Sequence, residues 1–183
     1  MTNYTLVLFF HFVGLTALFA GYGLEWIITS LLRRATSSGE VRSLLGVYRK
    51  SLPISGPGLL ILILSGGYLA QFSGGMKQGW ISASSLGIVL ALGMGFVLIL
   101  PRVKTIRAAL PEGNAALPAN VTSLLQAGAL PALIRVRVFV ALGIIYLMTV
   151  KPDSFASSMI ALGISIVLGI AASAPLFGKV KAS

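Results

Sequence analysis

The stretch WISASSLGIVLALGMGFVLILPRVK, residues 80–104, places a long apolar run directly before two basic residues. Trp80 to Leu100 carry no charge, and Arg102 and Lys104 follow at once. The hydrocarbon core of a bilayer needs about 20 apolar residues of helix, and basic residues beside a span stay on the cytoplasmic side. The stretch therefore predicts a transmembrane helix whose carboxyl end faces the cytoplasm.

The same pattern recurs along the chain and sets the fold class. The expected spans cover residues 6–32, 54–72, 80–100, 132–150 and 155–174. The fourth reaches full length only if Arg135 and Arg137, at its start, extend their side chains to the inner head groups. We predict an all-α, polytopic membrane helix bundle in which residues 1–183 form a single transmembrane domain of five helices.

The basic residues predict the orientation of these spans. Twelve of the 14 lysines and arginines fall into three clusters, and only Lys77 and Lys151 lie in the gaps between them. With the clusters on the cytoplasmic side, the N-terminus is outside and the C-terminus is cytoplasmic, as in a multi-pass protein of the bacterial inner (plasma) membrane. The clusters are Arg33, Arg34, Arg42, Arg49 and Lys50; Arg102, Lys104, Arg107, Arg135 and Arg137; and Lys179 and Lys181.

Composition narrows the function classes. Apolar residues make up 56% of the chain and charged residues 10%, against roughly 25% charged in a soluble domain. Without cysteine, disulfides, thiolate metal sites and thiol catalysis are excluded. The basic residues that give the net charge of +10 flank the spans and do not line one polar face. Anionic lipids of the inner leaflet are therefore the expected partner, and nucleic acid is not.

The connections at the cytoplasmic side are predicted to hold little regular structure. Residues 40–52 alternate apolar and basic side chains at helical spacing, which suggests a short helix lying in the interface. Residues 101–131 contain four prolines and indicate a turn-rich connection with one short helix. No segment is long enough for a soluble domain, so the protein acts within or beside the bilayer.

Small residues recur every fourth position in three spans and predict close helix packing. Packing within one bundle is the favoured interpretation, and homodimerisation through one of the grooves is the alternative. Membrane-complex partners also fit such grooves. The positions are Ala161, Ser165, Gly169 and Ser173; Gly87, Ala91 and Gly95; and Gly66 and Ala70.

Span one carries a polar stripe at steps of three and four residues, which places its members on one helix face. The stripe is His11, Gly14, Leu18, Gly21 and Glu25. Ionisable groups at such depth usually face the bundle interior or a water-filled cavity. Glu25 either pairs with Arg135 or Arg137, or forms a site for a proton, a cation or a polar ligand.

His11 is the only histidine of the chain. It is either a hydrogen-bonded or head-group-facing residue, or a ligand of haem iron, with Gly14 and Gly21 leaving space for the cofactor. A sixth haem ligand would then be Met94, Met148, Met159 or water. Phosphate loops, zinc-protease motifs and nucleophile elbows are missing from the sequence, so we assign no catalytic residue.

Four short motifs carry a family resemblance: HFVGLTALFAGYG (His11 to Gly23), GPGLLILILSGGYL (Gly56 to Leu69), GWI (residues 79–81) and YLMTVKP (Tyr146 to Pro152). With them the chain resembles a family of bacterial integral membrane proteins of unknown function. That family is distantly similar to copper-resistance D-type proteins and HemJ-type protoporphyrinogen oxidases. The resemblance implies a four- or five-helix bundle with His11 facing inward, associated with haem b in the HemJ-type branch.

The sequence departs from the HemJ-type pattern at one point. Those enzymes carry a second histidine-bearing motif after the glycines, and this chain reads GYGLEWIITSLLRR there, with Glu25 and no histidine. Protoporphyrinogen oxidation is therefore not expected, although a membrane oxidoreductase remains open. The favoured hypothesis is a non-enzymatic accessory subunit or small transporter centred on the span-one stripe. The alternative is a redox-linked membrane protein that holds haem b through His11.

Overall fold

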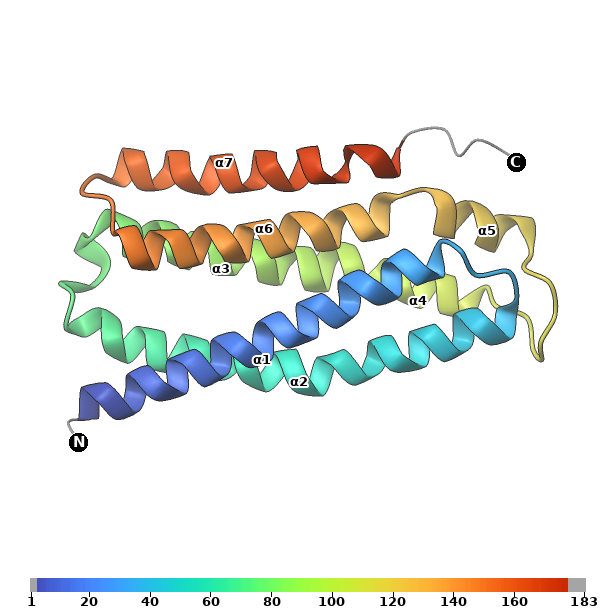
Figure 1. Cartoon of the computed structure of the whole chain (residues 1–183), viewed down its shortest axis with the longest axis horizontal. Coiled ribbons are helices and arrows are strands. Elements are labelled where there is room, and N and C mark those ends of the chain that lie inside the picture. The colour runs from blue at the N-terminus through green and yellow to red at the C-terminus, as the bar shows by residue number, and fades with distance from the viewer. Residues whose placement is uncertain (1–2, 178–183) are drawn as a thin grey trace.

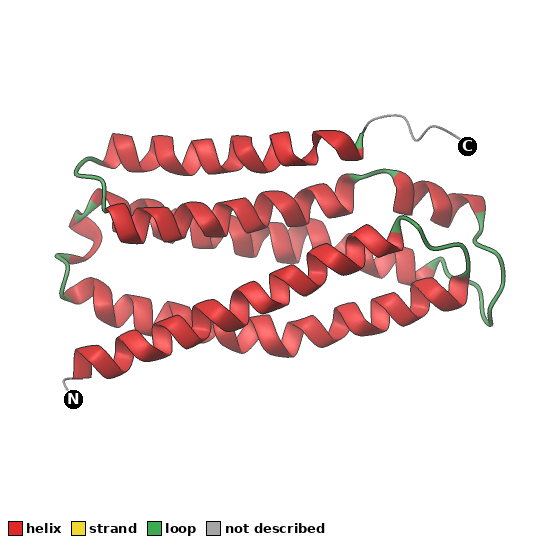
Figure 2. Cartoon of the chain, in the orientation of Figure 1, coloured by secondary structure: helices red, strands yellow, loops and turns green. Residues whose placement is uncertain are grey.

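A computed structural model describes residues 3–177, and the regular elements in that part of the chain are helices (Figures 1 and 2). Five helical stretches are long and apolar enough to cross a membrane, as expected. The elements are α1 (Asn3–Leu32), α2 (Ser38–Gln71), η1 (Gly75–Lys77), α3 (Gly79–Gly93), η2 (Met94–Ile99), α4 (Leu100–Ala108), α5 (Ala119–Gln126), α6 (Ala129–Val150), α7 (Phe155–Ser173) and η3 (Ala174–Leu176).

The helices form two groups that lie side by side. In one, α1 packs along α2; in the other, α6 packs against both α3 and α7. The groups meet chiefly where α1 contacts α6. At one end of the bundle lie the end of α1, the start of α2 and the ends of α4 and α7 (Figure 1). We call this the basic end, because the first two basic clusters flank these helix termini.

Small residues bring α1 and α2 into backbone contact. A Cβ atom added to Gly14 would lie 2.8 Å from the carbonyl oxygen of Gly58, and one added to Gly58 would lie 2.9 Å from that of Gly14. Two turns further along α1, a Cβ on Gly21 would lie 2.5 Å from Ser55 Cβ. In a membrane, where apolar burial gives little net drive between helices, such close approach supplies the dispersion contacts that hold a pair together.

The second group uses small residues in the same way. A Cβ on Gly143 of α6 would lie 2.5 Å from Ser165 Oγ of α7, and one on Gly169 would lie 2.7 Å from Val136 Cα. A Cβ on Gly87 of α3 would lie 2.9 Å from Ile144 Cγ1 of α6. These stripes are therefore filled by neighbouring helices of the same chain, which is the favoured interpretation of the sequence.

The predicted interfacial helix at residues 40–52 is not a separate element. It is continuous with the second span in α2, a helix of 34 residues that includes Pro53 and Pro57. Ser37 caps the start, where its hydroxyl accepts from the backbone N–H of Glu40 at 3.3 Å, and the Glu40 carboxylate accepts from Thr36 N–H at 3.0 Å. Each proline removes one backbone hydrogen bond. The helix nevertheless continues through both prolines, because packing against α1 stabilises it.

The third span also continues further than predicted. A π-helical segment, η2, follows α3, and α4 then extends the helix beyond Pro101 to Ala108. Pro101 directly follows the π-helical segment, where Leu100 N–H bonds to Gly95 O and the regular backbone hydrogen-bond pattern is already interrupted. The predicted turn-rich segment therefore shortens to residues 109–118, followed by the short helix α5, and α6 begins at Ala129 and not near residue 132.

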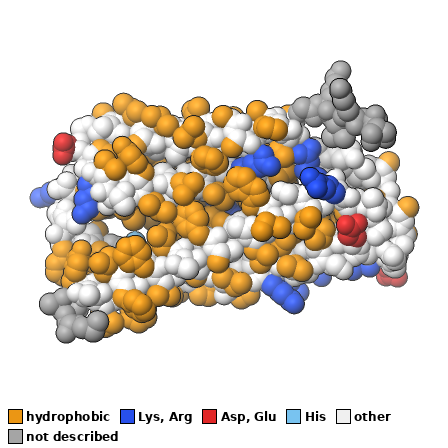
Figure 3. Space-filling view, in the orientation of Figure 1, with side chains coloured by type: hydrophobic (Ala, Val, Ile, Leu, Met, Phe, Trp, Pro, Cys, Tyr) orange, Lys and Arg blue, Asp and Glu red, His pale blue; other side chains and the backbone are white. Residues whose placement is uncertain are grey.

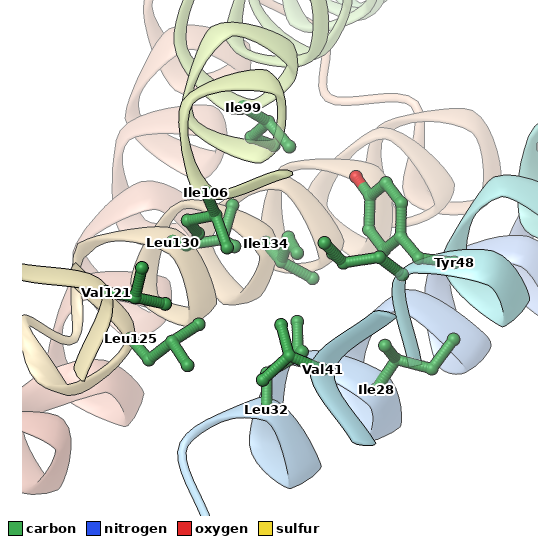
Figure 4. Close-up of a cluster of buried hydrophobic side chains, with 11 residues drawn as sticks. Ile28, Leu32, Val41, Tyr48, Ile99, Ile106, Val121, Leu125, Leu130 and Ile134 are labelled. Atoms are coloured by element: carbon green, nitrogen blue, oxygen red, sulfur yellow. The ribbon is translucent and has the colours of Figure 1, made fainter. Parts of the chain in front are cut away.

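A hydrophobic cluster joins the two groups near the basic end (Figure 4). Its buried side chains come from α1, α2, η2, α4, α5 and α6, so this end resembles the core of a soluble helical domain. The members are Ile28, Leu32, Val41, Leu45, Tyr48, Ile99, Ile106, Val121, Leu125, Leu130 and Ile134. Elsewhere, large apolar side chains cover much of the outer surface (Figure 3), as expected for helices that contact lipid.

Candidate functional site

A buried ion pair connects the two helix groups. Glu25 of α1 is 1% exposed and Arg137 of α6 is 7% exposed. The Arg137 Nη2 donates to Glu25 Oε2. Ser51 Oγ of α2 lies 3.2 Å from the second oxygen, Glu25 Oε1, and 2.7 Å from Tyr48 O, so its single proton serves one of the two acceptors.

Two further contacts hold the arginine in place. The guanidinium carbon of Arg137 lies 4.3 Å from the ring centroid of Tyr22, within the range of a cation–π interaction. A Cβ on Gly95, in the π-helical segment, would lie 3.1 Å from Arg137 Nη1, so a larger residue there would crowd the guanidinium. We call Glu25, Arg137, Ser51 and Tyr22 the ionic clamp, since together they connect α1, α2 and α6.

Arg135, the other arginine considered for Glu25, lies elsewhere. Its Nη1 donates to Ala172 O near the end of α7 at 2.7 Å, and its guanidinium carbon lies 5.2 Å from the Trp26 ring centroid. Arg33 Nη2 donates to Leu176 O at 2.9 Å. Cations near a helix carboxyl end satisfy its free carbonyl groups and its dipole. Arg135 and Arg33 therefore attach α7 to the rest of the bundle.

The clamp geometry favours a structural role for Glu25. A buried carboxylate is stable only when its charge is compensated and its lone pairs are hydrogen-bonded. Here Arg137 supplies the opposite charge and Ser51 lies beside the other oxygen. A site for a transported cation or polar ligand would need an accessible carboxylate oxygen, whereas the Glu25 side chain is buried and its Oε2 is bound by Arg137.

His11 has a different environment. It is 9% exposed, and its Nδ1 lies 2.9 Å from Ser65 Oγ of α2. Ser65 Oγ in turn donates to Ile61 O at 2.5 Å. Ser65 has one hydroxyl proton and two acceptors within reach, Ile61 O and His11 Nδ1. The shorter contact to Ile61 O favours donation there, which leaves Nδ1–H as the donor to Ser65 and Nε2 with the free lone pair of the neutral imidazole. A hydrogen bond at one ring nitrogen that orients the other is the usual arrangement of a histidine ligand.

The histidine lies where the two helix groups separate. The contacts between α1 and α6 involve the part of α1 from Leu15 onward, where Leu18 and Tyr22 pack with Ala141 and Val138. His11 lies before this region, toward the start of α1. Figure 3 shows the histidine, in pale blue, at the edge of a hollow between the lower and upper helices.

Gly14 and Gly21 do not provide space for a cofactor, contrary to the expectation from the sequence. The volume beside them is filled by Gly58 and Ser55 of α2. Their small size serves helix packing. Gly66 of α2 lies beside the histidine ring instead, since a Cβ there would be 3.3 Å from His11 Cε1.

The donor set limits what kind of metal His11 can hold. Among residues 3–177, no group of three or more His, Cys, Asp or Glu side chains is arranged to bind a metal ion. A bare ion needs three or four protein ligands, whereas haem supplies four nitrogens of its own and needs one or two axial ligands. The methionines considered as sixth ligands lie on other helices: Met94 in η2, Met148 on α6 and Met159 on α7.

Sequence reasoning missed Tyr22, Ser51 and Ser65 as site residues. A signal for the two serines was present in α2, where small and hydroxyl residues recur at steps of three and four. These positions are Ser51, Ser55, Gly58, Leu62 and Ser65, and all are buried on the face toward α1. Tyr22 lies one residue from the polar stripe of span one, and no pattern in the sequence distinguishes it from an interfacial aromatic residue.

Comparison with known protein families assigns the chain to one of them. Residues 5–152 match a family described as "Predicted integral membrane protein (DUF2269)". The chain belongs to this family. The DUF2269 match runs from α1 to the end of α6 and includes His11 and the whole ionic clamp. It confirms a multi-pass integral membrane protein, and it gives no support to the similarity with copper-resistance D-type or HemJ-type proteins. Searches among curated proteins and among solved structures found no match.

Proposed function

We propose that this DUF2269 protein is a haem b-binding, redox-linked membrane protein in which His11 is an axial ligand through Nε2. The observation that carries the proposal is the Ile61–Ser65–His11 hydrogen-bond chain, which favours the tautomer with a free Nε2 lone pair. The hollow at the same level (Figure 3) and the single histidine favour a cofactor that brings most of its own ligands. When bound, such a cofactor supplies one-electron transfer.

The protein's own residues have separate parts in this proposal. Ser65 orients the imidazole, because loss of its hydroxyl would free the ring to rotate and to change tautomer. Gly66 leaves room beside the ring. The ionic clamp, further along α1, holds α6 to the α1–α2 pair and so sets the distance between the two groups on either side of His11.

A reduced-minus-oxidised visible spectrum of the purified protein, produced with ample haem, tests the proposal. We expect a Soret band in the wild type that is lost in His11→Ala. In Ser65→Ala we expect the band to be retained with weaker haem affinity, by about 10- to 100-fold, as for other hydrogen-bond partners of histidine ligands. Thr16→Ala is the control. Thr16 is an exposed hydroxyl residue of α1, the helix that carries His11, and its loss should leave the spectrum unchanged.

A colourless wild type, or a His11→Ala variant that keeps its Soret band, would refute the haem proposal. In the first case the alternative takes its place: a non-enzymatic accessory subunit or small transporter. The closed ionic clamp favours the accessory subunit over the transporter, since Glu25 is already neutralised within the chain.

The orientation in the membrane is also a proposal: N-terminus outside and C-terminus cytoplasmic, in a bacterial inner membrane. Its support is that the first two basic clusters flank helix termini at the same end, whereas Lys77 and Lys151 lie in the connections at the other end. The third cluster, Lys179 and Lys181, lies outside the described residues. We expect a reporter fused after Lys181 to be active in the cytoplasm; activity only on the outer side would contradict the orientation.

A further inference from the structure

Three arginines surround a pocket at the basic end, away from His11 and the ionic clamp. Arg42 and Arg49 come from α2 and Arg107 from α4, and Leu45 and Gly46 complete the lining. The pocket has a volume of about 210 Å³. At about 30 Å³ per water molecule, it has room for a phosphate group together with a few waters.

Positive charge in this pocket has no partner within the described chain. Arg42 donates to Gly113 O at 3.2 Å and to Pro111 O at 2.5 Å, which holds its guanidinium in place. Arg49 and Arg107 form no hydrogen bond or ion pair with any residue between 3 and 177, where the only ion pair is that of Arg137 with Glu25. Three exposed cations that line one pocket without a carboxylate give it a positive potential, which favours an anion from outside the chain.

The depth of the pocket indicates a lipid. The 34 residues of α2 span about 51 Å at 1.5 Å per residue, whereas the hydrocarbon core is about 30 Å thick. The first turns of α2, with Arg42 and Arg49, therefore reach into or beyond the head-group layer. Leu52 follows Arg49 by three residues on the same helix face and is 49% exposed. It offers an apolar surface to an acyl chain beside the arginines.

We propose that this pocket binds the phosphate group of an anionic phospholipid. The guanidinium fork of arginine suits bidentate recognition of phosphate oxygens, and three such groups on two helices would connect α2 to α4 through the lipid. This inference does not depend on haem binding at His11.

Binding of labelled phosphatidylglycerol to the purified protein in neutral detergent tests the inference. One basic residue near an anionic lipid surface contributes about a fivefold change in affinity, so the double variant Arg49→Gln, Arg107→Gln should bind about 30-fold more weakly. The control is Arg34→Gln with Lys104→Gln, which removes the same charge from exposed positions outside the pocket. It should change affinity less than threefold. Phosphatidylcholine should compete poorly.

Three results would overturn the inference. Equal weakening in the pocket and control variants would show non-specific attraction to basic charge. Unchanged binding in the pocket variant would place the lipid elsewhere. Displacement of the lipid by inorganic phosphate at concentrations comparable to the lipid would assign the pocket to a soluble phosphate compound. Thermal melting of both variants in neutral detergent checks that each is folded.

Discussion

Glu25→Gln should lower the thermal midpoint of the purified protein in detergent by roughly 6–20 °C. Removing one partner of a buried ion pair leaves the other charge uncompensated, which destabilises by about 3–5 kcal/mol, and for a chain of this size each kcal/mol shifts the midpoint by about 2–4 °C. Here the remaining charge is Arg137, which is 7% exposed and lies against Tyr22 of α1 and Gly95 of η2. Thermal unfolding in a mild detergent measures the effect.

Two further variants distinguish the effect of breaking the ion pair from the effect of removing any carboxylate. Glu112→Gln removes an acid from an exposed loop and should leave the midpoint within about 1–2 °C, since such surface changes are usually below 0.5 kcal/mol. Glu25→Met combined with Arg137→Met replaces the pair by apolar side chains and should recover most of the stability lost in Glu25→Gln. Wild-type stability in Glu25→Gln would show that the clamp does not hold the helix groups together.

The second large effect is expected at the crossing of α1 and α2. Gly58→Ala would place a Cβ 2.9 Å from the Gly14 carbonyl oxygen and 2.9 Å from Leu18 N. Because both are backbone atoms of a helix, neither can move alone, and the helices must separate. Overpacking of this kind destabilises by about 1–3 kcal/mol, so we expect the midpoint to fall by roughly 2–12 °C.

Gly67→Ala is the matched control on the same helix. A Cβ at Gly67 meets no atom within 4 Å, and alanine favours helix over glycine by up to about 1 kcal/mol. The two alanine substitutions should therefore shift the midpoint in opposite directions. A loss of similar size in both would mean that α2 is sensitive to glycine replacement for a reason other than contact with α1.

The fold class was predictable from the sequence, but the helix boundaries were not. Five apolar stretches and their basic flanks define the spans, because bilayer thickness fixes how long each must be. The expected second span begins after Pro53 and the expected third span ends before Pro101, and proline lacks the N–H that continues a helix. In the structure Pro53 lies within α2 and Pro101 within the continuous stretch Gly79–Ala108. Tertiary packing outweighs the tendency of proline to end a helix, and the sequence alone does not reveal which prolines will lie inside one.

The site was predictable only in part, for a geometric reason. Glu25 and the two candidate arginines are evident in the sequence, but Arg135 and Arg137 are two positions apart and so point to different faces of α6. Which face meets α1 depends on how α6 packs, and the structure directs Arg137 to Glu25 and Arg135 to α7. Likewise, Gly14 predicts a close neighbour, but only the fold identifies that neighbour as Gly58.

The attachment of α7 has a consequence for the order in which the bundle assembles. Every residue of the ionic clamp precedes Pro152, where the family match ends, so the first four spans can join before α7 exists. At a synthesis rate of about 5–20 residues per second, the 19 residues of α7 follow roughly 1–4 s later. During that interval Gly143 of α6 lacks its partner Ser165, and Arg33 and Arg135 lack the carbonyl groups that they cap. We therefore expect the nascent protein to pass through a stage in which the Gly143 groove on α6 is open and these two arginines lack their acceptors in the segment that follows.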